Sequence, residues 1–223
     1  LFRSVVYPDG RTSGTIGGGK MEALVTQAAV EAIAEGGSRI VQFNLQDLET
    51  GDPGICGGAL EVFIDVNVSQ PTLLLVGGGH VAQPVAHIAH MCDFRVVVID
   101  DRADMVTPER FPDAAEYVAG DIVDILDQRD ITPETYIVIV TRGHALDEQA
   151  LRAVIDSPAA YIGMIGSRRK VRVIFEHLRA DGIDESLIES VHSPIGLDIG
   201  SETPAEIAVS IAAELVAVRR NKT

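Results

Sequence analysis

The first group of residues able to do chemistry is a glycine turn that follows an apolar run at 72–76. The segment 77–82 reads Gly-Gly-Gly-His-Val-Ala, which matches the pattern G-x-G-x-x-A at the start of an expected helix. In this pattern Gly77 permits a tight turn, and Gly79 lets a phosphate group approach the backbone. Asp100 ends the next apolar run, where its carboxylate can accept hydrogen bonds from a ribose. These residues predict a site for a nucleotide or a related phosphate ligand; the alternative is a tight turn and a solvated acid.

A second glycine turn lies near the start of the chain. Gly17, Gly18 and Gly19 precede a helix expected to begin near Lys20. Free N–H groups in such a turn and the positive end of the helix dipole favour an anion, and Lys20 adds positive charge. The alternative is a turn that binds nothing.

The first of the two cysteines stands in a glycine-rich segment. Cys56 is followed directly by Gly57 and Gly58, so backbone and thiol can both approach a ligand. A thiolate there can act as a soft metal ligand or as a nucleophile. The alternative is that the glycines only form a turn. Cys92 follows apolar helix positions and is expected to be a small buried residue without a chemical role.

Polar residues also follow the apolar run at 136–140. His144 and Asp147 stand just after it, and open α/β sheets hold ligands at the carboxyl ends of their strands. His144 is a candidate base or ligand, and Asp147 a candidate acid or base. Alternatively, Asp147 caps the next helix and His144 is solvated.

A basic segment follows the apolar run at 161–165. Ser167, Arg168 and Arg169 open the next expected helix together with Lys170. Cations at a helix N-terminus form a plausible clamp for an anion. The alternative is a basic first turn exposed to solvent.

In the second part of the chain, short apolar runs alternate with helical patterns. The strands and helices that they predict would position the motifs described above. The expected strands there are 72–76, 95–99, 136–140 and 161–165, and the expected helices are 81–91, 122–128, 147–155, 168–180 and 204–218. The runs lack polar alternation, as parallel strands covered on both faces do. Upstream, strands at 3–7, 39–45 and 60–66 surround a helix that ends at Gly36.

The fold class is therefore α/β. A small N-terminal α/β domain at 1–68 is followed by a Rossmann-like, doubly wound and mostly parallel sheet at 69–223, with the boundary at a Val-Ser-Gln-Pro stretch. Because Leu1 falls inside a strand pattern, we expect the N-terminal domain to continue upstream.

Composition excludes several classes of protein. The 223 residues carry a formal charge of −15, which disfavours nucleic acid and anionic membranes as partners. Two cysteines and no long apolar run predict a reducing, cytoplasmic setting, and no zinc-protease or serine-hydrolase motif is present. A homodimer is expected only from the prevalence of dimers among soluble proteins.

Taken together, the motifs are more specific than any one of them. They are, in order, Thr15–Gly19 with Glu22, Cys56–Gly58, Gly77–Val81, Asp100–Arg102, Tyr161–Lys170, Pro194–Gly200 and Thr203–Ser210. This order resembles the XdhC/CoxI family, the accessory factors of xanthine dehydrogenase and related molybdenum hydroxylases. The segments after Tyr161 and Pro194 are the most distinctive, whereas the turn at Gly77 occurs in many unrelated proteins.

The resemblance implies a chaperone that binds molybdenum cofactor (molybdopterin), rather than a hydroxylase. It implies two partners: a cysteine desulfurase that sulfurates the cofactor, and a xanthine dehydrogenase-type hydroxylase subunit that receives it. The candidates for cofactor binding are then the three glycine turns, His80, Asp100 and the segment Ser167–Arg169. Cys56 is a possible molybdenum ligand. Many relatives have a cysteine where this chain has Lys20, and a histidine where it has Arg142.

A second function stays open from the residues alone. Gly77, Gly79 and Asp100 also fit an NAD(P)-dependent oxidoreductase, which needs an acid or base beside the nicotinamide. His80, His144 and Asp147 are the candidates for that group. Arg102, two residues after Asp100, leaves the choice between NAD and NADP open.

Overall fold

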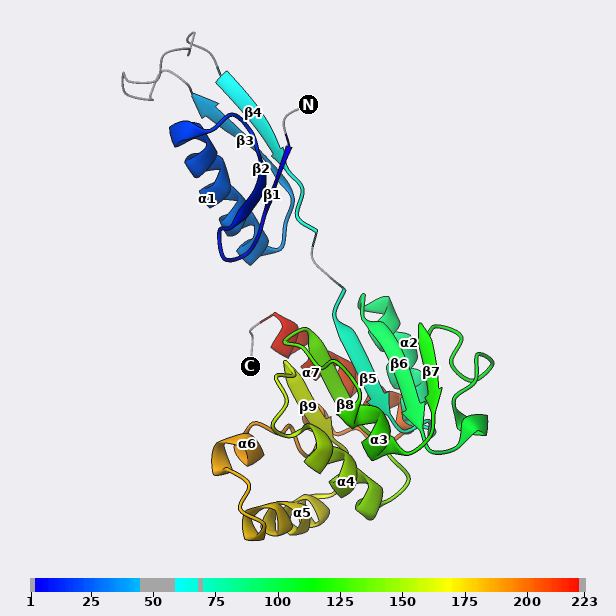
Figure 1. Ribbon diagram of the computed structural model, residues 1–223. Helices are drawn as coiled ribbons and strands as arrows, with labels where there is room; N and C mark the ends of the chain where they lie inside the picture. Colours follow the sequence, from blue (N-terminus) through cyan, green and yellow to red (C-terminus); the bar gives the residue numbers. More distant parts are fainter. Residues whose placement is uncertain (1–2, 45–58, 68–69, 221–223) are drawn as a thin grey trace. The chain divides into compact units, whose positions relative to one another are not determined.

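The computed structural model describes residues 3–44, 59–67 and 70–220 (Figure 1). The chain divides into two compact units, Leu1–Ser69 and Gln70–Thr223. Within the described residues, no helix combines the length and the apolar character that a membrane crossing requires.

The first unit consists of two antiparallel strand pairs and one helix. Its elements are β1 (Arg3–Val6) paired with β2 (Thr12–Thr15), α1 (Gly19–Glu35), and β3 (Arg39–Asn44) paired with β4 (Ala59–Ile64). Helix α1 packs Ala29 and Ala32 against Ile64 of β4 to form a small core. It ends at Gly36, whose positive φ of 70° suits glycine in the left-handed conformation that closes a helix.

The second unit contains a parallel sheet of five strands in the order β7-β6-β5-β8-β9. The strands are β5 (Thr72–Val76), β6 (Arg95–Asp100), β7 (Glu116–Ala119), β8 (Thr135–Ile139) and β9 (Tyr161–Met164). This confirms the Rossmann-like, doubly wound α/β fold that the sequence predicts.

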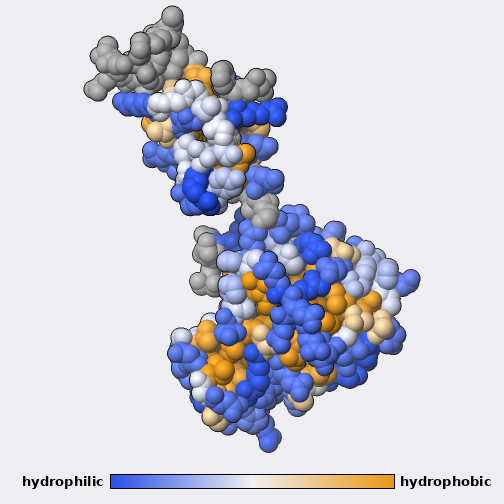
Figure 2. Space-filling view, viewed as in Figure 1, coloured by the Kyte–Doolittle hydropathy of each residue, from blue (hydrophilic) through white to orange (hydrophobic). Residues whose placement is uncertain are grey.

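Helices cover both faces of this sheet (Figure 1). The elements are α2 (Ala82–Met91), the 3-10 turn η2 (Ala103–Met105), α3 (Ile122–Asp127), α4 (His144–Val154), α5 (Arg168–Ala180), α6 (Glu185–Glu189) and α7 (Pro204–Arg219). Along β5, Leu73 and Leu75 pack with α2 and α7, whereas Leu74 and Val76 pack with α3, α4 and α5. Two apolar layers therefore explain why the strands lack polar alternation. On the face shown in Figure 2, hydrophilic residues surround scattered apolar patches of the second unit.

Most element bounds agree with the sequence within a few residues. Four short elements were not expected: the strands β2 and β7, the 3-10 turn η2 and the helix α6. The residues of β2 are all exposed, and β7 lies at a sheet edge with half-buried side chains, so neither shows a buried apolar run. Helix α4 begins at His144 rather than near Asp147, so Gly143 rather than Asp147 is its N-cap residue. By contrast, the capping box of Thr203 and Glu206 at the start of α7 is present as predicted.

The strand order reverses direction at β5, which gives the sheet a topological switch point. The chain runs outward from β5 through β6 to β7, then returns to place β8 on the other side of β5. Loops after β5 and β8 therefore leave the sheet in opposite directions. Open α/β sheets bind ligands at this point, and the glycine turn after β5 lies there.

Candidate functional site

The turn after β5 is packed tightly against the end of β8 at its first glycine. Gly77 donates its N–H to the carbonyl of Ile99 at 2.7 Å and has a φ of 114°. A Cβ atom at this position would lie 2.4 Å from the carbonyl oxygen of Val140. Only glycine satisfies both the backbone conformation and this close approach.

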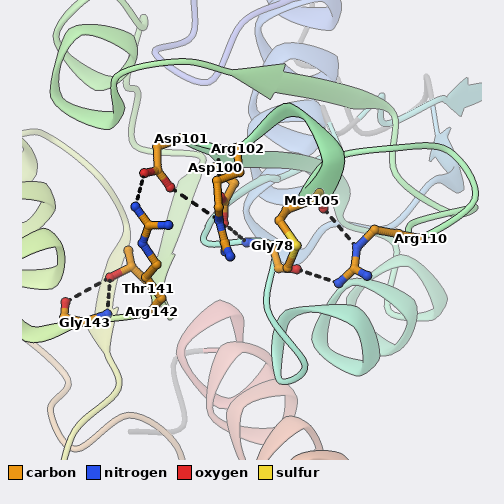
Figure 3. A network of polar contacts seen from close by, with 9 residues as sticks. All are labelled: Gly78, Asp100, Asp101, Arg102, Met105, Arg110, Thr141, Arg142 and Gly143. Atoms are coloured by element: carbon orange, nitrogen blue, oxygen red, sulfur yellow. Dashed lines mark hydrogen bonds and ion pairs between the residues drawn. The ribbon is translucent and has the colours of Figure 1, made fainter.

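The second glycine joins the turn to the segment after β6 (Figure 3). Gly78 donates its N–H to Oδ2 of Asp100 at 2.7 Å, and a Cβ atom on it would lie 2.6 Å from the carbonyl oxygen of Met105. The Arg110 guanidinium donates to the carbonyls of Gly78 and Met105 at 3.1 and 3.3 Å. These contacts fix the turn in one conformation.

The third glycine is the open part of the turn. A Cβ atom on Gly79 would meet no atom within 4 Å. Among the described residues, none of the hydrogen bonds uses the backbone N–H of Gly79 or of His80. These donors lie directly before α2, where the helix dipole adds positive potential. The arrangement suits an anionic oxygen that approaches over Gly79. The imidazole of His80 is exposed.

The carboxylate of Asp100 is saturated by donors from the chain itself. Its Oδ1 accepts from the N–H and Nε of Arg102 at 3.0 and 2.9 Å, and its Oδ2 accepts from Nη2 of Arg102 at 3.2 Å and from Gly78. Burial raises the pKa of Asp100, but these bonds outweigh it and hold the pKa below its ordinary value. A carboxylate has about four acceptor sites, so all of them are filled.

An ion pair links two loops of this edge. Nη2 of Arg142, after β8, lies 2.5 Å from Oδ2 of Asp101, after β6 (Figure 3). The strand β5 lies between β6 and β8, so the pair spans the end of β5. Arg142 is thus a cation that is already paired with an acid.

Asp147 is buried and has a structural role in this arrangement. Its Oδ1 accepts from the N–H and hydroxyl of Thr141 at 3.0 and 2.7 Å, and its Oδ2 pairs with the ammonium of Lys170. The carboxylate is fully enclosed and already paired, which disfavours a role as acid or base. His144, the first residue of α4, is exposed.

The basic segment after β9 is divided among different roles. Ser167 caps α5 by accepting from the N–H of Lys170, and Lys170 turns inward to Asp147. Arg168 and Arg169 are exposed. Because β9 is two strands away from β5, its end lies about 10 Å from the end of β5.

The glycine turn before α1 belongs to the first unit. Gly17, Gly18 and Gly19 all have positive φ values, of 129°, 77° and 70°. Glu22 in the first turn of α1 accepts from the hydroxyl of Thr15 at 3.1 Å and from the N–H of Ile16 at 3.3 Å. The carboxylate of Glu22 therefore stabilises this turn, and its negative charge disfavours the binding of an anion beside it.

The predicted cysteine site lies outside the described residues. It comprises Cys56, Gly57 and Gly58. In the part of the chain that the structure describes, no group of three or more His, Cys, Asp or Glu residues is placed to hold a metal ion.

A buried polar cluster that sequence reasoning missed supports the distinctive segment Pro194–Gly200. Glu214 of α7, 8% exposed, accepts from the hydroxyl of Tyr161 and, at 2.9 Å, from the N–H of Gly196. Its Oε1 lies 3.3 Å from Nδ1 of His192, whose ring packs on Tyr161. Burial raises the pKa of Glu214, but the bonds from His192, Tyr161 and Gly196 hold it below its ordinary value.

This lowered pKa predicts a pH-dependent contribution of Glu214 to stability. The unfolded state takes up the proton first as pH falls, so the contribution is present above the ordinary value of about 4.5 and is lost below it. We expect Glu214→Gln to lower the free energy of unfolding by about 1–3 kcal/mol at neutral pH, and by clearly less near pH 4. Urea unfolding at both pH values measures this difference. The matched control is Glu189→Gln, at an exposed position. If Glu214→Gln lowered the free energy of unfolding as much near pH 4 as at neutral pH, the assignment would be contradicted.

Two family models and two curated proteins are similar to this chain in sequence. A model of the XdhC Rossmann domain matches residues 73–215, and a model of the XdhC and CoxI family matches residues 3–44. The uncharacterized protein YqeB of Escherichia coli strain K12 is 36% identical over 221 residues, 97% of this chain and 40% of that protein. A probable xanthine dehydrogenase subunit of Bacillus subtilis strain 168 is 28% identical over 159 residues, 71% of this chain and 46% of that protein.

The chain thus spans less than half the length of these two relatives. Among solved structures, a xanthine dehydrogenase from Bacillus halodurans superimposes with a TM-score of 0.62 at 21% identity, covering 99% of this chain and 86% of that chain. At this identity the likeness supports the fold alone.

Proposed function

Because the chain belongs to the XdhC/CoxI family, we propose that it is an accessory factor of a xanthine dehydrogenase-type molybdenum hydroxylase. In this role it binds molybdenum cofactor, supports its sulfuration by a cysteine desulfurase and delivers it to the hydroxylase. Family membership supports the association with xanthine dehydrogenase. Cofactor binding is the step that the geometry of the second unit supports.

The observation that carries this proposal is the open N-terminal end of α2 over Gly79. Molybdenum cofactor bears a phosphate, which needs backbone donors and a neutral or positive surrounding. The N–H groups of Gly79 and His80 provide the donors. Arg102 neutralises Asp100 nearby, so this buried acid does not repel an anion. When bound, the cofactor supplies the metal dithiolene that the hydroxylase uses.

Cys56 would supply a soft ligand for that metal. The assignment rests on its residue type and its glycine neighbours. In this proposal Arg168 and Arg169 guide the anionic cofactor toward the sheet edge by charge alone, since both are exposed.

The alternative, an NAD(P)-dependent oxidoreductase, is less well supported by the same geometry. A dinucleotide site needs acceptor sites on Asp100 for the ribose hydroxyls. All of these sites are filled by Arg102 and Gly78. NAD could use them only after Arg102 had moved away.

Cofactor content tests the proposal. We expect the chain purified anaerobically from a cofactor-producing host to carry molybdenum and pterin, and Gly79→Ala to lower cofactor affinity by about tenfold. The added methyl group intrudes where the phosphate approaches, and losing one hydrogen bond to a charged group costs about 1.5 kcal/mol. Gly37→Ala, where a Cβ atom also meets nothing within 4 Å, is the matched control.

Two further measurements test the role of Cys56 and the choice between a cofactor carrier and an oxidoreductase. Loss of pterin in Cys56→Ser would place the thiol at the site. Retention of pterin would exclude Cys56 from the site, while the role of the protein as a cofactor carrier would stand. Absence of pterin in the wild type under saturating cofactor supply, combined with tight binding of NAD, would overturn the proposal in favour of the oxidoreductase.

A further inference from the structure

A groove of about 340 Å³ lies between α5 and the segment Ser193–Pro194. Its apolar part consists of Val171, Phe175 and Pro194. Three guanidinium groups, from Arg168, Arg172 and Arg179, line it along the helix. Of these residues only Arg168 is also assigned to the cofactor, so cofactor binding does not explain the combination.

Two of these arginines bring positive charge into the groove on a strongly acidic protein. Arg168 approaches Asp198 at 3.9 Å with both side chains more than 85% exposed, so this pair is weak. Within the described residues, Arg172 has no ion-pair partner, and it is exposed. Arg179 differs, because its guanidinium already donates two bonds to Glu185, at 2.8 and 2.6 Å. On a chain of net charge −15, Arg168 and Arg172 attract acidic groups locally.

The length of the groove indicates what kind of ligand fits. Its lining residues on α5 run from Arg168 to Arg179, which at about 1.5 Å of rise per residue are about 16 Å apart. An extended peptide covers this length with about five residues. A small anion would contact only one part of the groove, and the overall acidity disfavours nucleic acid.

The opposite wall of the groove is held in place before any ligand binds. The hydroxyl of Ser193 donates to the carbonyl of Met164 at 2.8 Å. The adjacent His192 is held by its backbone bonds to β9 and by Glu214. A wall fixed in this way lowers the entropy cost of binding.

We propose that this groove binds an extended acidic segment of a partner protein. Carboxylates of the segment pair with Arg168 and Arg172, and one apolar side chain packs on Phe175 and Pro194. The inference goes beyond cofactor binding and does not depend on it.

Selection of random decapeptides displayed on phage, against the full chain, tests this inference. We expect enriched peptides to contain several Asp or Glu residues around an apolar residue. Arg172→Glu should weaken the best synthetic peptide by at least tenfold, and Phe175→Ala should weaken it with less effect on its salt dependence. Arg220→Glu makes the same charge change at the exposed C-cap of α7, outside the groove, and should leave affinity within about twofold.

Three results would contradict the binding of an acidic segment in this groove. Enrichment without acidic residues, or equal binding to the wild type and Arg172→Glu, would overturn the proposal. A dimer in sedimentation that Arg172→Glu dissociates would also overturn it, because the occupant would be a second copy of the chain. Peptide binding by Arg172→Glu and cofactor content of Gly79→Ala are separate readouts, so either proposal can fail alone.

Discussion

Gly77→Ala is expected to lower the free energy of unfolding of the second unit by at least about 3 kcal/mol. Two effects act together at this position. The φ of 114° is a conformation that residues with a side chain rarely adopt. The new Cβ atom would also lie 2.4 Å from the carbonyl oxygen of Val140, so the ends of β5 and β8 would have to separate.

A matched glycine in the same turn serves as the control. A Cβ atom on Gly79 meets nothing within 4 Å, so Gly79→Ala should stay within about 0.5 kcal/mol of the wild type. Thermal and urea unfolding of both variants measure the difference. If Gly77→Ala were as stable as Gly79→Ala, the close packing of the turn against β8 would be wrong.

This contrast shows how far the sequence could predict the site. The pattern at 77–82 is enough to predict a turn between a strand and a helix, and the structure has that turn. It is not enough to tell that Gly77 packs while Gly79 is open. The difference depends on Val140, which only the sheet topology brings beside the turn.

The same reasoning applies to the fold. The runs at 72–76 and 95–99 are apolar throughout, because each is buried on both faces, and such strands are easy to predict. Strand β7 was missed because Glu116 and its neighbours are only half-buried at the sheet edge. The start of α4 was missed because Gly143, a weak helix signal, precedes it.

Side-chain partners were the least predictable part of the site. Asp100 is a strand-end acid in the sequence, but the orientation of Arg102 decides whether its oxygens are free. Glu214 and Tyr161 are 53 residues apart, and only the packing of α7 on the sheet joins them. A glutamate inside the apolar pattern of that helix was the one available signal, because a buried acid needs partners.

Lys170→Met is the second substitution with a large expected effect. Lys170 is the counter-ion of Asp147, whose side chain is completely buried, while its own side chain is 12% exposed. Removing one partner of a buried ion pair leaves an uncompensated charge, which costs about 3–5 kcal/mol. We therefore expect a loss of this size in urea unfolding. Lys20→Met, at an exposed position of the first unit, should have almost no effect.

A double variant separates this charge effect from lost packing. Asp147→Asn keeps an oxygen that can accept from the N–H and hydroxyl of Thr141, but it carries no charge. Combined with Lys170→Met it should recover most of the lost stability, because no buried charge remains unpaired. A double variant as unstable as Lys170→Met would mean that the methylenes of the lysine matter more than its charge. A tolerated Lys170→Met would show that Asp147 needs no counter-ion and would restore it as a candidate acid or base at the carboxyl edge of the sheet.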